Sequence, residues 1–170
     1  MTCFTLNGKP VTSQLPASTR LSDVLRNEMG LSGTKIGCNA GDCGACSVLL
    51  DGAPICSCLT AVAQVDGAAV ASIEGLHADG TIVKLQDSFL AHGAAQCGIC
   101  TPGMMVAASA LLAENPAPNR QDVEDALGGV LCRCTGYSKI IDAVLAVCGD
   151  AKISPRPQAG QNVGSPIRHL

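Results

Sequence analysis

The stretch GCNAGDCGACSVLL (37–50) begins with ten residues that hold three cysteines and three glycines. The cysteines are Cys38, Cys43 and Cys46, in a C-x4-C-x2-C pattern, and the glycines are Gly37, Gly41 and Gly44. Three thiolates so close in sequence require the backbone to wrap tightly round one object, and glycine permits the positive φ angles that such wrapping needs. Glycine also lets backbone N–H groups point at ligand sulfurs. The stretch therefore predicts a thiolate metal loop.

Short strands are expected on both sides of this loop. Asn7-Gly8 lies between alternating apolar residues, the strongest short signal for a β-hairpin, and Asp51-Gly52 separates two further apolar runs. A helix is expected over residues 18–30, where apolar residues recur at helical spacing. Strands, one helix and more strands around a metal loop predict an α+β fold.

The chain beyond residue 80 is helical in character. Helices are expected over residues 81–93, 101–115, 119–131 and 135–148. Thr101 and Thr135, each directly behind a pair of cysteines, are expected to cap the second and fourth of these helices. Four short helices predict a bundle.

Two pairs of cysteines lie in this helical part. Cys97 and Cys100 form C-x2-C, and Cys132 and Cys134 form C-x-C. Helix N-termini stabilise anions and lower the pKa of thiols, so two facing helix starts would cage an anionic cluster held by four cysteines. On spacing alone, zinc is an alternative. A redox-active dithiol at Cys97 and Cys100 is a weaker one, because no βαβ pattern surrounds the pair.

The fourth ligand of the first site is Cys56 or Cys58. The two are separated by one residue, so both side chains face the same way in an extended strand and spacing does not choose between them. Structural zinc is again an alternative, although it more often uses two C-x2–4-C knuckles. The other alternative for this site is a set of buried thiols that bind no metal. Cys3, Cys148 and the remaining one of the pair are expected to be small buried apolar side chains.

The composition narrows the class of protein. The 170 residues carry a net charge of −3 and show no basic stripe, which argues against nucleic-acid binding. Neither a secretory signal nor an apolar run of membrane-spanning length is found, so a cytoplasmic protein without a membrane segment is expected. Eleven cysteines in such a chain favour metal binding over disulfides. The three histidines lack ligand spacing and are expected to be surface residues.

Four motifs together resemble one known family. They are CNAGDCGAC (38–46), SCL (57–59), QCGICTPGMM (96–105) and LCRCTGY (131–137). The chain resembles the small iron–sulfur subunit of the molybdenum hydroxylases, the family of xanthine dehydrogenase, aldehyde oxidoreductase and carbon monoxide dehydrogenase, over roughly residues 3–148. The first spacing is also that of plant-type 2Fe-2S ferredoxins, except that the fourth cysteine follows Cys46 by only 12 residues.

The resemblance implies the domains and the cluster ligands. A β-grasp plant-type ferredoxin-like domain over 1–76, a four-helix 2Fe-2S-binding domain over 77–149 and an extended or disordered tail over 150–170 are expected. Each domain would hold one 2Fe-2S cluster, and SCL favours Cys58 as the fourth ligand of the first. The implied ligands are Cys38, Cys43, Cys46 and Cys58 for the first cluster and Cys97, Cys100, Cys132 and Cys134 for the second.

The resemblance also implies partners. The chain would be the electron-transfer subunit of a heterooligomeric oxidoreductase, relaying single electrons from a molybdopterin site to flavin or another acceptor. Gln96 and Cys134 match positions that contact the pterin. A large molybdopterin-binding subunit and a medium FAD-binding subunit are implied, assembled as a dimer of heterotrimers. No catalytic residue is expected in this chain, because the substrate would be oxidised in another subunit.

Overall fold

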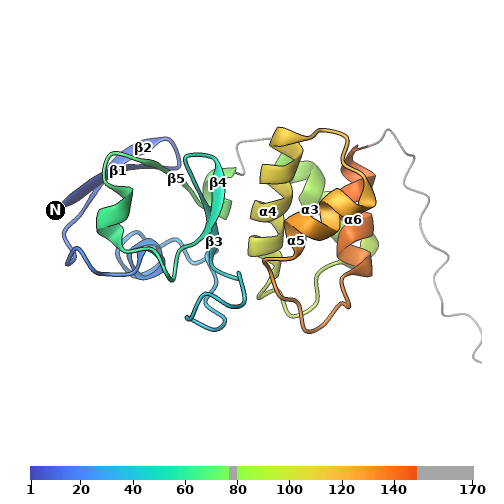
Figure 1. The fold of residues 1–170 in the computed structure, drawn as a ribbon, viewed down its shortest axis with the longest axis horizontal. Coiled ribbons are helices and arrows are strands. Elements are labelled where there is room, and N and C mark those ends of the chain that lie inside the picture. Colours follow the sequence, from blue (N-terminus) through green and yellow to red (C-terminus); the bar gives the residue numbers. More distant parts are fainter. Residues whose placement is uncertain (77–79, 149–170) are drawn as a thin grey trace, which may run out of the picture.

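The computed structural model describes residues 1–76 and 80–148, which form a strand-rich half followed by a helical half (Figure 1). The expected tail over 150–170, and with it His169, lies outside the described residues, as does His77. The strands are β1 (Thr2–Leu6), β2 (Lys9–Ser13), β3 (Ser47–Leu50), β4 (Ala53–Cys56) and β5 (Ala69–Ala71). The longer helices are α3 (Gly80–His92), α4 (Thr101–Glu114), α5 (Arg120–Leu127) and α6 (Ser138–Cys148).

The strands form one mixed sheet in the order β2-β1-β5-β3-β4, in which only the β1–β5 pair is parallel. Both predicted hairpins are confirmed. Asn7 and Gly8 have φ of 52° and 78°, and Asp51 and Gly52 have φ of 49° and 89°. Two successive positive φ angles belong to the two-residue turn whose twist matches that of the flanking strands. The α+β class follows from the sheet and the helices together.

One face of the sheet is covered by short helical segments. The predicted first helix is present as α1 (Leu21–Asp23), which continues into a π-helical turn, η1 (Val24–Glu28). A 3-10 turn, η2 (Val62–Val65), lies against the same core. The side chains that fill this core are aliphatic except for Phe4: Phe4, Leu6, Leu21, Val24, Leu25, Val48, Val62, Val65 and Val70.

The four helices predicted for the second half are confirmed, and a short helix, α2 (Ile73–Leu76), precedes them. The helix α4 contacts β3 and β4 on one side and α3 and α5 on the other, so it joins the two halves (Figure 1). Its apolar character all round fits this position, since Met104, Val106 and Ala108 are completely buried. Among the described helices, none is long and apolar enough to cross a membrane.

The contact between the halves is close because glycines line it. A methyl group on Gly103 would lie 2.6 Å from the carbonyl oxygen of Gly44, and one on Gly44 would collide with the carbonyl of Gly129. Gly44 also has a φ of 65°, a conformation that costs other residues free energy. The cysteine loop over residues 37–46 therefore touches the helical half through its backbone.

Candidate metal centres

The loop before β3 turns its backbone N–H groups toward cysteine sulfur. The N–H groups of Ala40, Asp42 and Cys43 each donate to the Sγ of Cys38 over 3.3 Å, and the N–H of Cys38 donates to the Sγ of Cys43 over 3.3 Å. A methyl group on Gly37 would lie 2.6 Å from the Sγ of Cys43. The loop is thus a nest of donors that suits anionic sulfur, as the interleaved glycines predict.

The four cysteines of this first site lie in two pairs. The side chains of Cys38 and Cys43 are within hydrogen-bonding distance of each other, and so are those of Cys46 and Cys58. Cys46 and Cys58 are 3% and 2% exposed, whereas Cys38 is at the surface. One sulfur pair is therefore buried, and the other consists of the exposed Cys38 and the half-buried Cys43.

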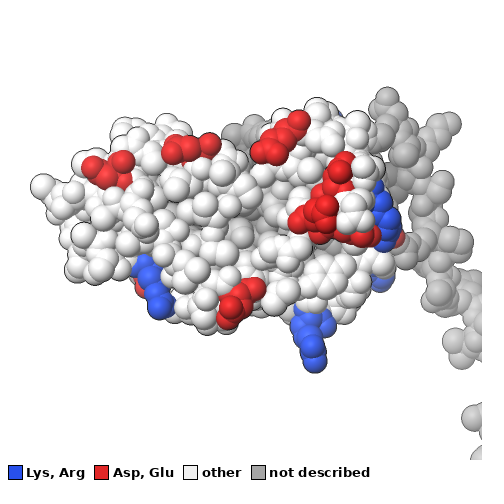
Figure 2. All heavy atoms as spheres, in the orientation of Figure 1, with Lys and Arg blue, Asp and Glu red and all other residues white. Residues whose placement is uncertain are grey.

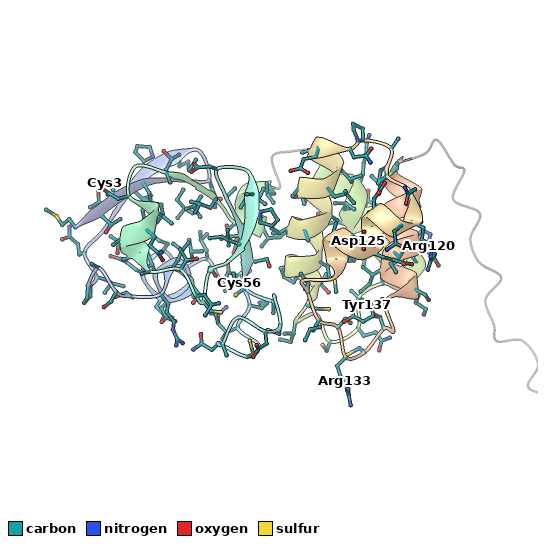
Figure 3. The ribbon with its side chains drawn as sticks, viewed as in Figure 1. Cys3, Cys56, Arg120, Asp125, Arg133 and Tyr137 are labelled. Carbon is teal, nitrogen blue, oxygen red and sulfur yellow. The ribbon has the colours of Figure 1, made fainter. Side chains whose placement is uncertain are left out.

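The structure brings Cys56 to the same place as Cys58. Cys56 ends β4 and is half-buried, its Sγ lying 3.9 Å from the carbonyl oxygen of Gly41, and its side chain is within reach of Cys46 (Figure 3). Both candidates for the fourth ligand remain at the first site. Among the other cysteines, Cys148 is half-buried, but Cys3 is exposed, so the expectation of a buried apolar side chain is wrong for Cys3.

The helical half brings its two cysteine motifs together in a crossed arrangement. The thiol of Cys134 donates to the Sγ of Cys97 over 3.6 Å, while Cys100 and Cys132 meet behind them. Cys97 and Cys134 are exposed, whereas Cys100 and Cys132 are 7% and 8% exposed. The first cysteine of one motif therefore pairs with the last cysteine of the other, and again one pair lies outward and one inward.

The predicted threonine caps are wrong at both helix starts. Cys100 occupies the N-cap position of α4, and Thr101 is the first helical residue, with a buried hydroxyl that has no hydrogen-bond partner within the described structure. Thr135 does not cap α6, which begins only at Ser138, because Gly136 and Tyr137 have φ of 63° and 66° and turn the chain first.

Thr135 instead belongs to a group of hydrogen bonds around Cys132. Its hydroxyl donates to the Sγ of Cys132 over 3.1 Å and accepts the N–H of Tyr137 over 3.2 Å. The hydroxyl of Tyr137 in turn accepts the N–H of Cys132 over 2.9 Å. Neither the cysteine spacing nor the helical pattern predicts this role, because it depends on the turn between Cys134 and α6.

The environment gives the thiols very different acidities in the metal-free chain. Backbone N–H groups of Ala40 and Cys43 lower the pKa of Cys38 from 9.0 to about 7. Burial, and then Cys46, raises the pKa of Cys58 to about 11, and burial, then Cys132, raises the pKa of Cys100 to about 12.

Cys132 combines both influences. Burial opposes its charged form, yet its pKa lies below the ordinary value because the Thr135 hydroxyl and nearby N–H groups donate to the sulfur. Protein donors therefore support the negative charge of Cys38 in the first site and of Cys132 in the second.

The residues present fit iron–sulfur clusters. Within residues 1–76 and 80–148, no three His, Cys, Asp or Glu side chains converge as they would on a single metal ion. The sulfurs lie in pairs, and a cluster with two irons takes two cysteines on each iron. Donor N–H groups at Cys38, the space left by Gly37 and the unpaired hydroxyl of Thr101 beside Cys100 also suit an anionic group with several sulfur atoms.

The outward edge of the helical site is open. Gln96, Cys97 and Cys134 are exposed. Arg133, in the loop that also carries Cys134, projects away from the body of the protein (Figure 3). Apolar side chains accompany them, since Ile99 and Leu131 are 46% and 54% exposed. Acidic side chains gather elsewhere, over α5 (Figure 2). The loop that carries Cys132 and Cys134 thus presents a cationic and apolar edge.

One backbone contact joins the two sites. The N–H of Leu131 donates to the carbonyl oxygen of Cys43 over 2.9 Å, and Leu131 directly precedes Cys132. No local pattern in the sequence indicates this bond, because its partners come from different halves of the chain.

Two family models match the chain and together span most of the described residues. The model for a 2Fe-2S iron-sulfur cluster binding domain matches residues 4–70, and the model for a [2Fe-2S] binding domain matches residues 72–145.

Individual known proteins are similar to this chain over almost the same part of its sequence. The nicotine 6-hydroxylase small subunit of Paenarthrobacter nicotinovorans is 47% identical, over 85% of this chain and 87% of the relative. The aldehyde oxidoreductase of Megalodesulfovibrio gigas is 45% identical over 84% of this chain, which is only 16% of that longer protein. The solved structure of quinoline 2-oxidoreductase from Pseudomonas putida 86 superimposes with a TM-score of 0.82 at 48% identity, covering 86% of this chain and 92% of the matched one.

Proposed function

The chain belongs to the 2Fe-2S iron–sulfur subunits of the molybdenum hydroxylases, and from this premise we propose which residues hold its two clusters. It is an electron-transfer component of an oxidoreductase whose substrate-oxidising site lies in another subunit. When bound, each cluster takes up and releases one electron at a time. The proposed ligands are Cys38, Cys43, Cys46 and Cys58 for the first cluster and Cys97, Cys100, Cys132 and Cys134 for the second.

The observation that carries this assignment is the arrangement of the eight sulfurs. Each site offers a buried pair and a more accessible pair, which is Cys38 (exposed) with Cys43 (half-buried) in the first site, and the helical site closes through the 3.6 Å contact between the sulfurs of Cys97 and Cys134. The proposed domain boundaries, 1–76 and 77–149, separate the two sets of ligands, and 150–170 is proposed to be a tail outside both domains.

Different parts of the chain have different roles in holding the clusters. In the first loop, backbone N–H groups at residues 40, 42 and 43 support the charge of Cys38. In the helical half, the buried pair of Cys100 and Cys132 excludes water from the inner side of the site. The backbone bond from Leu131 to Cys43 keeps the two sites adjacent, as transfer of single electrons between them requires.

The partners are proposed from the outward edges of the sites. Gln96 and Cys134 are exposed beside Cys97, and we assign them to the contact with the molybdopterin cofactor of a large subunit. Electrons would enter the chain there and leave it near Cys38 toward FAD on a medium subunit. Relatives such as the nicotine 6-hydroxylase small subunit are parts of multi-subunit enzymes. A cytoplasmic dimer of heterotrimers completes the proposed assembly.

Metal analysis of the native complex tests the cluster content. About four iron and about four acid-labile sulfide atoms per copy of this chain are expected, with two distinct low-temperature EPR signals after reduction. One cluster or none in the intact complex would overturn the proposal, and so would zinc in place of iron. Co-purification of a molybdenum-containing large chain tests the proposed partner.

A further inference from the structure

Cys132 lies in a closed set of three hydrogen bonds with Thr135 and Tyr137. The Thr135 hydroxyl lies 3.1 Å from the Sγ of Cys132, the Tyr137 N–H lies 3.2 Å from the Thr135 hydroxyl, and the Cys132 N–H lies 2.9 Å from the Tyr137 hydroxyl. The set contains one of the two buried sulfurs of the helical site and neither of the exposed ones. It therefore acts on one ligand out of four.

The direction of the Thr135 hydroxyl follows from its neighbours. A backbone N–H can only donate, so the bond from Tyr137 occupies a lone pair on the Thr135 oxygen. The hydroxyl proton is then free to point at the other partner, the Sγ of Cys132. Thr135 therefore donates to the sulfur in this arrangement. The two hydrogen-bond partners of its hydroxyl fix the orientation of the O–H group.

Tyr137 holds this arrangement in place. Its φ of 66° is unusual for a residue with a side chain, because the left-handed region is disfavoured for such residues. The conformation persists because the ring packs against the core of the helical half and the hydroxyl accepts the N–H of Cys132. Figure 3 shows Tyr137 between α5 and the loop that carries Arg133.

This donor differs from those of the first site. The sulfurs of Cys38 and Cys43 accept backbone N–H groups, which most residue types can provide. Cys132 accepts, in addition to nearby N–H groups, a side-chain donor that depends on the identity of residue 135. A substitution can therefore remove it without changing any backbone group.

We propose that Thr135 is a positioning residue whose hydroxyl, bonded to the Sγ of Cys132, raises the reduction potential of the helical-domain cluster above that of the same cluster without this bond. Reduction adds negative charge that spreads onto the ligand sulfurs, and a donor to sulfur stabilises the reduced form more than the oxidised form. The inference rests on the proposed ligand role of Cys132.

The test is an EPR-monitored redox titration of the purified holo-complex, carried out on the wild type and on two variants. Thr135→Val removes the donor at nearly constant shape, and Thr135→Ser keeps the donor without the methyl group. We expect Thr135→Val to make reduction of the helical-domain cluster about tenfold less favourable, which is ~59 mV for one electron. The Thr135→Ser variant and the ferredoxin-like cluster in every variant should keep their wild-type potentials.

A second measurement covers the case in which the valine variant is unstable. Thr135→Ala also lacks the donor. Pulsed EPR after exchange into D₂O should detect, beside the deuterons of nearby backbone N–H groups, one further deuteron coupled to the helical-domain cluster in wild type and Thr135→Ser that is lost in Thr135→Ala. An unchanged potential in the donor-free variants, or an equal shift at both clusters, would overturn the proposal. Loss of the helical-domain cluster from both donor-free variants would make Thr135 a structural residue instead.

The cluster content separates this proposal from the one on which it rests. If wild-type protein contains fewer than two clusters, the ligand assignment fails and the role of Thr135 fails with it. If both clusters are present and only the expected shift is absent, the ligand assignment stands and the role of Thr135 alone is wrong.

Discussion

The backbone N–H of Leu131 donates a 2.9 Å hydrogen bond to the carbonyl oxygen of Cys43, and this bond links the two cysteine loops. Cys43 is a proposed ligand of the first cluster, and Leu131 is covalently attached to Cys132, a proposed ligand of the second. Gly44 and Gly103 lie beside this bond without side chains, which lets the two backbones approach. The placement of the sites relative to each other thus depends on a few backbone contacts.

Substitution of Gly44 should loosen this contact. A methyl group there would collide with the carbonyl of Gly129, and a non-glycine residue is disfavoured at a φ of 65°. We expect Gly44→Ala to lower the free energy of unfolding by about 2–4 kcal/mol and to accelerate amide hydrogen exchange at Leu131. Gly67→Ala is the matched control, because Gly67 has a φ of 75° but no atom within 4 Å of its added methyl group. Equal exchange at Leu131 in both variants would contradict the role of Gly44.

The fourth ligand of the first site is decided by a pair of serine variants. Cys56 and Cys58 both lie near Cys46, but Cys58 is the buried one. We expect Cys58→Ser to remove the ferredoxin-like cluster or to alter its EPR signal strongly, and Cys56→Ser to retain the cluster with about two irons at that site. Iron analysis and EPR of both variants check this, and the reverse pattern would transfer the ligand role to Cys56.

Loss of an inner ligand of the helical site should interrupt electron flow. We expect Cys100→Ser to abolish or perturb the helical-domain cluster and to block reoxidation of the molybdenum site, while the EPR signal of the ferredoxin-like cluster persists. Cys148→Ser is the control, since Cys148 is a half-buried thiol outside both sites whose Sγ donates to the carbonyl oxygen of Val144 over 3.2 Å. Persistence of both signals and of turnover in Cys100→Ser would refute the ligand assignment.

The metal-free chain should show a pH-dependent reactivity at Cys38. Backbone N–H groups lower the pKa of this exposed thiol from 9.0 to about 7, so its thiolate appears as the pH rises through about 7, two units earlier than for an unperturbed thiol. The thiolate is the nucleophile, and alkylation by iodoacetamide should follow the same curve. Cys100, whose pKa burial raises to about 12, should remain unmodified up to pH 9. Peptide mass spectrometry after brief labelling measures both, and a midpoint near 9 at Cys38 would contradict the expected donation.

Short sequence patterns predicted correctly the hairpins and helices whose contacts join residues close together in the chain. Asn7-Gly8 and Asp51-Gly52 predict their hairpins because each turn needs two positive φ angles, which these residues accept at low cost. The four helices of the second half are equally local in origin. The predicted cap at Thr135 failed because its hydroxyl bonds the sulfur of Cys132 and the N–H of Tyr137, and the chain turns through Gly136 and Tyr137 before the helix begins at Ser138.

The sequence by itself determined the α+β class, the two sets of cysteines and the family, because residue spacing and glycine placement are carried by short stretches of chain. Only the tertiary structure decided how the sulfurs pair, with Cys97 next to Cys134 and Cys100 next to Cys132, and how the halves meet at Leu131 and Cys43. These contacts join residues far apart in the chain, and their geometry depends on the packing of α4 between the sheet and the other helices. Spacing sets which ligands are available, and packing sets where each of them points.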